Sequence, residues 1–152
     1  MTENKGLVYE YLGITIDYSI AGKVVFTMYN YLEDVIVEAA NDLKNSRSYY
    51  PGNDQLMKVD YNSPSLSTKD AELFYQHVVR LLFASKRARP NIQMCVVFLC
   101  TRAKSPNEQD YKKLGKVISY LKETVHLPLV TKKQQRNSNL EHQCIICCVS
   151  GL

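Results

Sequence analysis

The chain has 152 residues, of which 45% are hydrophobic and 22% are charged, values typical of an ordinary globular protein with one domain. No apolar run approaches the roughly 18 residues that a membrane-spanning helix requires, so we expect no membrane partner. The five cysteines are scattered and no signal peptide is recognisable. This favours an intracellular location, in the cytoplasm or the nucleus, over a disulfide framework.

The net charge of +4 conceals a sharp division along the chain. Residues 1–79 contain 6 Lys and Arg against 11 Asp and Glu, whereas residues 80–136 contain 13 against 3. The second segment therefore carries a net charge of +10, which favours an anionic partner such as nucleic acid. A solvated basic surface without a partner is the alternative.

The N-terminal part of the chain predicts a β-hairpin over residues 7–28. Alternation places one set of side chains on one side of an extended segment: Val8, Leu12, Ile14 and Ile16. The opposite side then carries Leu7, Tyr9, Tyr11 and Thr15. Residues 19–22 supply a turn, after which the alternation resumes. Such a hairpin is too small to be stable alone, so it must pack on the rest of the chain.

Helical periodicity after the hairpin predicts four helices, over residues 30–44, 69–86, 91–103 and 106–124. The expected fold class is therefore mainly α with an N-terminal β-hairpin (α+β).

The boundaries of these helices follow from capping signals. Asn30 and Ser67 are the expected N-caps of the first two helices. Pro90 excludes the preceding residue from the α region and can itself open the third helix. In the sequence Ser105-Pro106-Asn107-Glu108, the serine is the expected cap of the fourth helix.

Two segments predict no regular structure. Residues 45–66 are rich in Ser, Asn, Pro and Gly, which is typical of a long exposed loop. The periodicity stops after Pro128, and residues 131–152 are expected to form a disordered or non-native tail. Residues 1–130 are then the folded domain.

Five motifs occur in an order that resembles one known family. They are a Tyr-Leu-Gly strand, a hairpin through Gly22, an Asn-Tyr helix start, a basic helix followed by Arg-Ala-Arg-Pro, and a Ser-Pro-capped helix that ends in Tyr-Leu-Lys-Glu-Thr. Together they resemble the region just downstream of the catalytic centre in copia-type retrotransposon reverse transcriptases. The resemblance covers roughly residues 5–130.

The resemblance implies a primer-grip hairpin followed by a thumb that lies against the template–primer duplex. On this similarity, Leu12 and Gly13 fall at the tip of the primer grip. The groove-tracking face of the thumb would carry Tyr75, Val79 and Phe83, which are spaced to share one helix face. The alternative for these three side chains is an ordinary place in the core. Val79 and Asn91 depart from the family pattern, which has a small residue and an aspartate there.

The family's catalytic Tyr-x-Asp-Asp turn is absent, because the chain contains no Asp-Asp pair. Two-metal polymerase chemistry needs such paired carboxylates. We therefore expect no enzyme activity and no cofactor. We interpret the chain as a fragment of an RNA-directed DNA polymerase that is truncated before the RNase H domain. On this interpretation it keeps contacts with the template–primer and lacks a palm domain.

Basic side chains between the helical signals are the candidate contacts with nucleic acid: Lys86, Arg87, Arg89, Arg102 and Lys104. Tyr75 and Phe83 complete this candidate site. Because Lys and Arg contact phosphates without reading the bases, binding should depend on salt and not on sequence. A stand-alone basic nucleic-acid-binding module and a helical protein-interaction module are the alternatives.

A zinc site near the C-terminus is not expected. The candidate ligands His142, Cys144, Cys147 and Cys148 fall within seven residues, whereas zinc sites usually draw on two separated pairs. His77 and His126 are interpreted as structural or exposed residues.

Overall fold

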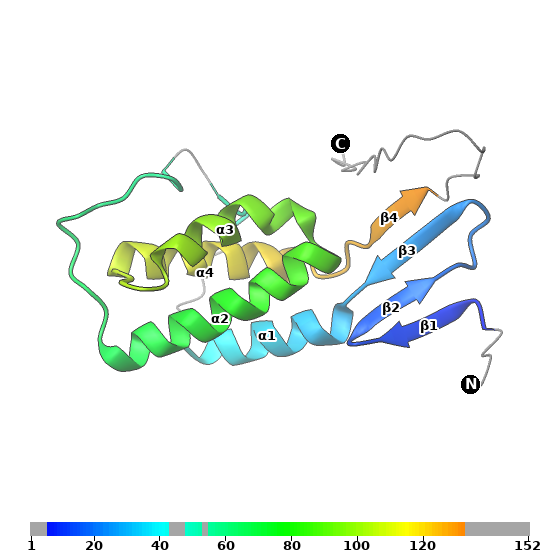
Figure 1. Cartoon of the computed structure of the whole chain (residues 1–152), viewed down its shortest axis with the longest axis horizontal. Helices are drawn as coiled ribbons and strands as arrows, with labels where there is room; N and C mark the ends of the chain where they lie inside the picture. The colour runs from blue at the N-terminus through cyan, green and yellow to red at the C-terminus, as the bar shows by residue number, and fades with distance from the viewer. Residues whose placement is uncertain (1–5, 43–47, 53–54, 133–152) are drawn as a thin grey trace.

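The computed structural model describes residues 6–42, 48–52 and 55–132, which form a helical bundle and an antiparallel sheet at one end of it (Figure 1). The strands are β1 (Val8–Tyr11), β2 (Ile14–Asp17), β3 (Lys23–Thr27) and β4 (Leu129–Lys132). The helices are α1 (Tyr29–Asp42), α2 (Thr68–Arg87), α3 (Gln93–Arg102) and α4 (Glu108–Glu123), with a 3₁₀ turn at Pro90–Ile92. The expected α+β class, with β structure first and four helices after it, is confirmed.

The expected hairpin is in fact three strands, because the chain reverses at Leu12 and Gly13. Both residues have positive φ, 50° and 76°, as a two-residue type I′ turn requires. Tyr11 and Ile14 therefore face each other across the turn. The sequence predicted that Tyr9 and Tyr11 lie on the opposite side of the strand from Ile14 and Ile16. This prediction is wrong, because directly opposed residues share one face of a sheet.

One face of the sheet is apolar. A row of directly opposed residues crosses all four strands on this face: Tyr9, Ile16, Phe26 and Leu129. Ile14 is buried, and Ile16 and Phe26 pack against the helical core. The sheet is thereby anchored to the bundle at the end where β3 runs into α1.

Strand β4 was not expected from the sequence, which predicted a tail from residue 131. Thr131 and Lys132 instead pair with Val24 and Lys23 of β3. A four-residue strand has too few residues to show a period of its own, and its position is fixed by β3, which is distant in the sequence. Residues 133–152 lie outside the described residues.

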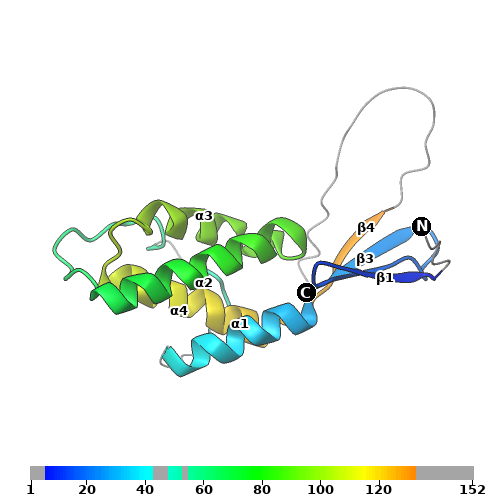
Figure 2. The same cartoon turned by 60° about the horizontal axis from the view of Figure 1, so that its bottom comes forward.

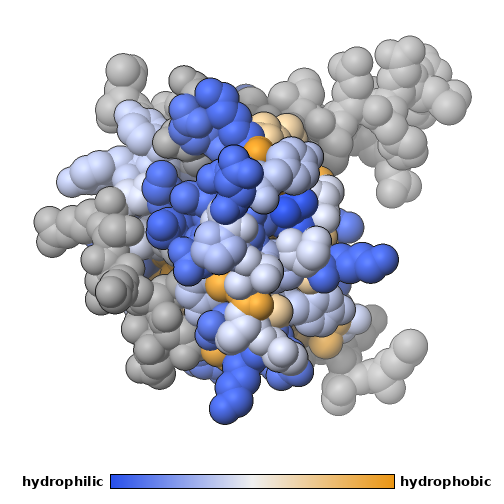
Figure 3. Space-filling view, turned by 90° about the vertical axis from the view of Figure 1, so that its left-hand side faces the viewer, coloured by the Kyte–Doolittle hydropathy of each residue, from blue (hydrophilic) through white to orange (hydrophobic). Residues whose placement is uncertain are grey.

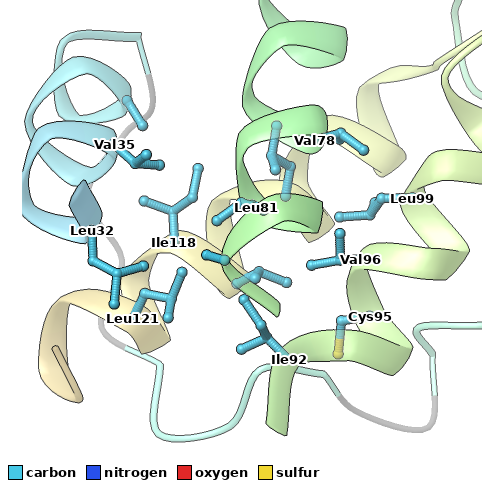
Figure 4. Close-up of a cluster of buried hydrophobic side chains, with 14 of the residues drawn as sticks. Leu32, Val35, Val78, Leu81, Ile92, Cys95, Val96, Leu99, Ile118 and Leu121 are labelled. Carbon is cyan, nitrogen blue, oxygen red and sulfur yellow. The ribbon is translucent and has the colours of Figure 1, made fainter. Parts of the chain in front are cut away.

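The helical core lies between all four helices (Figure 4). α2 is central, and its inner face buries Val78 and Leu81 completely. The other helices contribute further buried side chains: Leu32 and Val35 from α1, Val96 and Leu99 from α3, and Ile118 and Leu121 from α4. Each fully buried side chain of this size stabilises the fold by about 1.5–3 kcal/mol.

Two capping expectations are wrong and one is confirmed. Ser67 caps α2 and accepts from the backbone N–H of Asp70. α4 is capped by Asn107, not Ser105, and Asp110 completes a reciprocal capping box. Asn30 lies inside α1, whose first intrahelical bond runs from Leu32 N to the Met28 carbonyl.

The described part of the expected loop 45–66 is held against the start of α4. Leu66 N–H donates to the Pro106 carbonyl at 3.2 Å, and the Asn107 amide donates to the Asp60 carbonyl at 2.9 Å. Leu56 is buried in the core cluster. The loop therefore contributes to the packing of the domain. Among the helices of the described segments, none combines the length and the apolar character needed to traverse a lipid bilayer.

Candidate nucleic-acid interface

Gly13 of the β1–β2 turn lies beside Tyr31 of α1, and ring contacts continue from Tyr31 to the C-terminal end of α2; we call this arrangement the contact chain. A Cβ atom built on Gly13 would lie 3.9 Å from Cβ of Tyr31 on α1. The Tyr31 ring lies 5.3 Å from the ring of Phe83 on α2. The Arg87 guanidinium stands over the Phe83 ring, with 3.9 Å between its central carbon and the ring centroid. The residues expected at the primer-grip tip and at the end of the thumb helix are thus brought together.

Tyr31 is the centre of this cluster, and its role was not expected from the sequence. The only sequence signal was the Asn-Tyr motif at the helix start. Its hydroxyl donates to the Arg80 carbonyl at 3.3 Å, which ties α1 to α2. Burial raises the pKa of the Tyr31 phenol. Arg80 itself pairs with Glu38 of α1 and contributes little net charge to the surface.

The outer face of α2 carries the expected aromatic and apolar stripe. Tyr75 and Val79 are 57% and 45% exposed, so the core alternative is wrong for both. Phe83 is half-buried and packs partly against the core. Lys86 and Arg87 are exposed at the end of the same helix. α2 therefore carries exposed apolar side chains followed by two exposed cations at its C-terminal end, which lies beside the sheet (Figure 2).

Arg89 is not available to a phosphate, and its assignment to the site is corrected. It is only 2% exposed, and its guanidinium donates to the hydroxyl of Thr124 at 2.6 Å and to the Thr124 carbonyl. Its Nε donates to Asn91 at 3.3 Å. Burial lowers the pKa of the Arg89 guanidinium. This arginine fastens the turn after α2 to the end of α4.

Arg102 also has a structural partner, which corrects a second assignment. Its Nε donates to the carboxylate of Asp110 at 3.0 Å, and that carboxylate is 1% exposed. Lys113 Nζ lies 3.8 Å from the other oxygen of the same carboxylate and forms a second ion pair with it. A buried carboxylate needs such compensation, so Arg102 is committed to the α3–α4 junction.

Lys104 is exposed but stands apart from the α2 surface. It belongs to the α3–α4 turn, which lies at the end of the bundle away from the sheet (Figure 1), whereas Arg87 ends α2 beside the sheet. Figure 3 shows that this far end is largely hydrophilic, with small hydrophobic spots. The expected basic site is thus divided: Lys86 and Arg87 belong to the stripe, and Lys104 does not.

A shallow groove of about 310 Å³ lies beside the contact chain, between the β1–β2 turn and the start of α1. Its lining residues are Glu10, Tyr11, Leu12, Gly13, Thr15, Tyr29 and Asn30. The Tyr29 ring stacks on His126 with 5.5 Å between centroids. Aromatic and uncharged polar groups dominate the groove, and Glu10 makes it a poor site for a phosphate.

The remaining candidate residues do not extend this interface. His77 is buried on the inner side of α2. Burial raises the pKa of the Cys95 and Cys100 thiols. No group of three His, Cys, Asp or Glu side chains in residues 6–42, 48–52 and 55–132 could hold a metal ion. His142 and the three cysteines after it lie outside those ranges. Comparisons of the chain with protein-family models, curated proteins and solved structures give no match.

Proposed function

We propose that the chain is the primer-grip and thumb region of a copia-type reverse transcriptase, a non-catalytic fragment that binds template–primer duplex without sequence preference. The observation that supports the proposal is the contact chain from Gly13 through Tyr31 and Phe83 to Arg87. It brings together three of the five motifs that carry the family resemblance: Tyr-Leu-Gly at Gly13, Asn-Tyr at Tyr31, and the basic helix that contains Arg87.

The chemistry of this surface suits the backbone of a duplex. Lys86 and Arg87 are exposed cations that can neutralise phosphates, and Val79 and Tyr75 offer apolar area to sugars in a shallow groove. Because Arg89 and Arg102 are committed elsewhere, about two phosphate contacts remain, which predicts a salt slope near −1.8 on a DNA duplex. Binding at physiological salt should be in the non-specific range, on the order of 10⁻⁴ to 10⁻⁶ M.

A palm domain is a further partner on this proposal. The apolar sheet face leaves Tyr9 and Tyr11 exposed, and a parental polymerase would cover part of such a face.

The test compares two charge-matched double variants in a titration of labelled template–primer duplex at several salt concentrations. Lys86→Ala with Arg87→Ala removes both proposed phosphate contacts and should abolish the salt slope. Lys112→Ala with Lys116→Ala removes two exposed lysines of α4, whose outer face lies across the core from α2, and should leave most of the slope. Equal losses in the two variants, or no salt-dependent binding by the wild type, would contradict the proposal.

A helical protein-interaction module is the second candidate. It is favoured by exposed apolar side chains on neighbouring helices: Tyr75 and Val79 on α2, and Met94 and Val97 on α3. If the chain is such a module, the wild type should bind no nucleic-acid duplex even at low salt. The exposed surface of α2 would then contact a partner protein.

A further inference from the structure

β1 is an edge strand with an open outer side. The order of the sheet is β1-β2-β3-β4, and within the described residues no strand pairs with the side of β1 that faces away from β2. All four of its residues are exposed. Natural edge strands are usually protected by charged side chains, above all lysine, by proline, by a bulge, by being very short or by a covering segment. The four-residue sequence Val-Tyr-Glu-Tyr contains neither lysine nor proline, and Glu10 is its one charged residue.

The pairing with β2 fixes which backbone groups face outward. Tyr18 N–H donates to the Leu7 carbonyl at 2.7 Å, so Leu7 belongs to a hydrogen-bonded pair of the ladder. Such pairs alternate along an antiparallel ladder, so Tyr9 and Tyr11 also direct their backbone groups toward β2. Val8 and Glu10 therefore direct their N–H and C=O groups away from the sheet.

We propose that this edge pairs with β1 of a second copy of the chain, antiparallel, around a two-fold axis at Tyr9. In this register the backbone of Val8 exchanges two hydrogen bonds with the backbone of Glu10 in the second copy. By symmetry, Glu10 of the first copy exchanges two hydrogen bonds with Val8 of the second. All outward backbone groups of the strand are then satisfied, which is what an edge pairing requires.

The side chains are self-complementary in the same register. Tyr9 lies opposite Tyr9 of the second copy, and Tyr11 lies opposite Leu7 of the second copy. Aromatic and apolar side chains therefore meet on the apolar face of the sheet. Cross-strand aromatic pairs of this kind are favourable. Glu10 faces Val8 on the other face, so no two like charges are directly opposed. Self-complementarity in both backbone and side chains selects a second copy over an unrelated strand.

The shape of the molecule permits this pairing. The helical bundle extends from the end of the sheet where β1 stops and β2 begins (Figure 1). A two-fold axis perpendicular to the sheet at the middle of β1 therefore places the two bundles at opposite ends of a continuous eight-stranded sheet. Neither bundle lies in the path of the other.

The first test measures mass against concentration by sedimentation equilibrium with the full chain. The mass should rise from 17.4 kDa toward twice that value. Glu10→Pro removes one outward N–H from each copy without touching the ladder with β2, and it should weaken dimerisation by about tenfold or more. Glu10→Ala keeps the N–H and is the matched control. A monomer at all concentrations, or a dimer equally stable in both variants, overturns the proposal.

The second test does not depend on the proline variant folding. A non-hydrogen-bonded antiparallel pair has a Cα–Cα separation of about 4.5 Å, which a disulfide can bridge. Tyr9→Cys should therefore give a covalent dimer on mild oxidation, with the introduced thiols joined to each other in peptide mapping. Glu10→Cys points to the other face, opposite Val8, and should not. Equal cross-linking of both variants, or none in Tyr9→Cys, contradicts the two-fold register.

Discussion

The Arg89 guanidinium donates to the hydroxyl of Thr124 across 2.6 Å, from the turn after α2 to the C-terminal end of α4. The same guanidinium also donates to the Thr124 carbonyl, which in addition accepts from the backbone N–H of Leu127 at 3.1 Å. Asn91 extends the network, because its amide accepts from Arg89 and donates to the Tyr120 hydroxyl at 2.8 Å. One buried cation thus joins the turn after α2 to the C-terminal end of α4.

Replacing Arg89 should therefore affect stability more than binding. We expect Arg89→Ala to lower the free energy of unfolding by about 3 kcal/mol, since it removes the charge-assisted hydrogen bonds from the buried guanidinium to Thr124 and Asn91. Arg89→Lys should recover only part of this loss, because an ammonium cannot reproduce the guanidinium fork. Urea unfolding followed by circular dichroism measures both. Lys86→Ala is the control, and it should change stability by less than about 0.5 kcal/mol.

Asp110 and Arg102 should behave as a coupled pair. Asp110→Asn leaves Arg102 without its counter-charge and weakens the capping box of α4, so we expect a loss of about 2 kcal/mol. Arg102→Met should cost a similar amount, since the buried carboxylate then keeps only Lys113 Nζ, at 3.8 Å, as a neighbouring cation. The double variant should cost less than the sum, and a double-mutant cycle measures the coupling. Strictly additive losses would show that the two side chains act independently.

The helices were predictable because their signals are local. Ser67 and Pro90 mark helix starts through chemistry confined to a few residues, and the apolar stripes of α2 and α4 follow directly from a period of 3.6. β4 was not predictable in this way, since its only support is pairing with a strand about a hundred residues earlier. The Leu12–Gly13 turn was also missed, because apolar residues continue through it without a polar break.

The candidate site was predicted in part for a related reason. Sequence spacing placed Tyr75, Val79 and Phe83 on one face of a helix, and they do share one. Spacing cannot show whether a cation is already paired, because the partners of Arg89 and Arg102 lie on another helix. The basic segment 80–136 was therefore interpreted as a basic surface, although Arg89 and Arg102 within it have structural roles.

Leu12 offers a test of the turn itself. Its φ of 50° lies in the left-handed region, which costs a leucine about 1–2 kcal/mol. Leu12→Asn should raise the free energy of unfolding by about 0.5–1 kcal/mol, because asparagine before glycine suits a type I′ turn. Leu12 is 61% exposed, so little apolar burial is lost. Leu12→Ala removes the same side chain without this preference and should not stabilise. Thermal unfolding of the two variants distinguishes these outcomes.

We expect the purified chain to extend no primer. The prediction follows from the absence of an Asp-Asp pair in the sequence, because two-metal phosphoryl transfer needs closely spaced carboxylates. Primer extension on an RNA template, with magnesium or manganese, is the measurement. Nucleotide incorporation above that of a mock preparation would refute the proposal that the chain is a non-catalytic polymerase fragment. Binding of the duplex without nucleotide incorporation would agree with it.

Tyr31 should couple the β1–β2 turn to the α2 surface. Tyr31→Phe removes only the hydroxyl bond to the Arg80 carbonyl, so we expect a loss of about 1 kcal/mol and nearly unchanged duplex binding. Tyr31→Ala also removes the ring between Gly13 and Phe83, and we expect a loss of about 2–3 kcal/mol. Without that ring Phe83 keeps its contacts with the core but loses the aromatic neighbour on α1, and the Arg87 guanidinium that stands over Phe83 is held less firmly. Duplex affinity should then fall in Tyr31→Ala but not in Tyr31→Phe, when both are measured at a temperature where each variant is folded. Equal affinities in the two variants would show that the contact chain stabilises the fold without organising the binding surface.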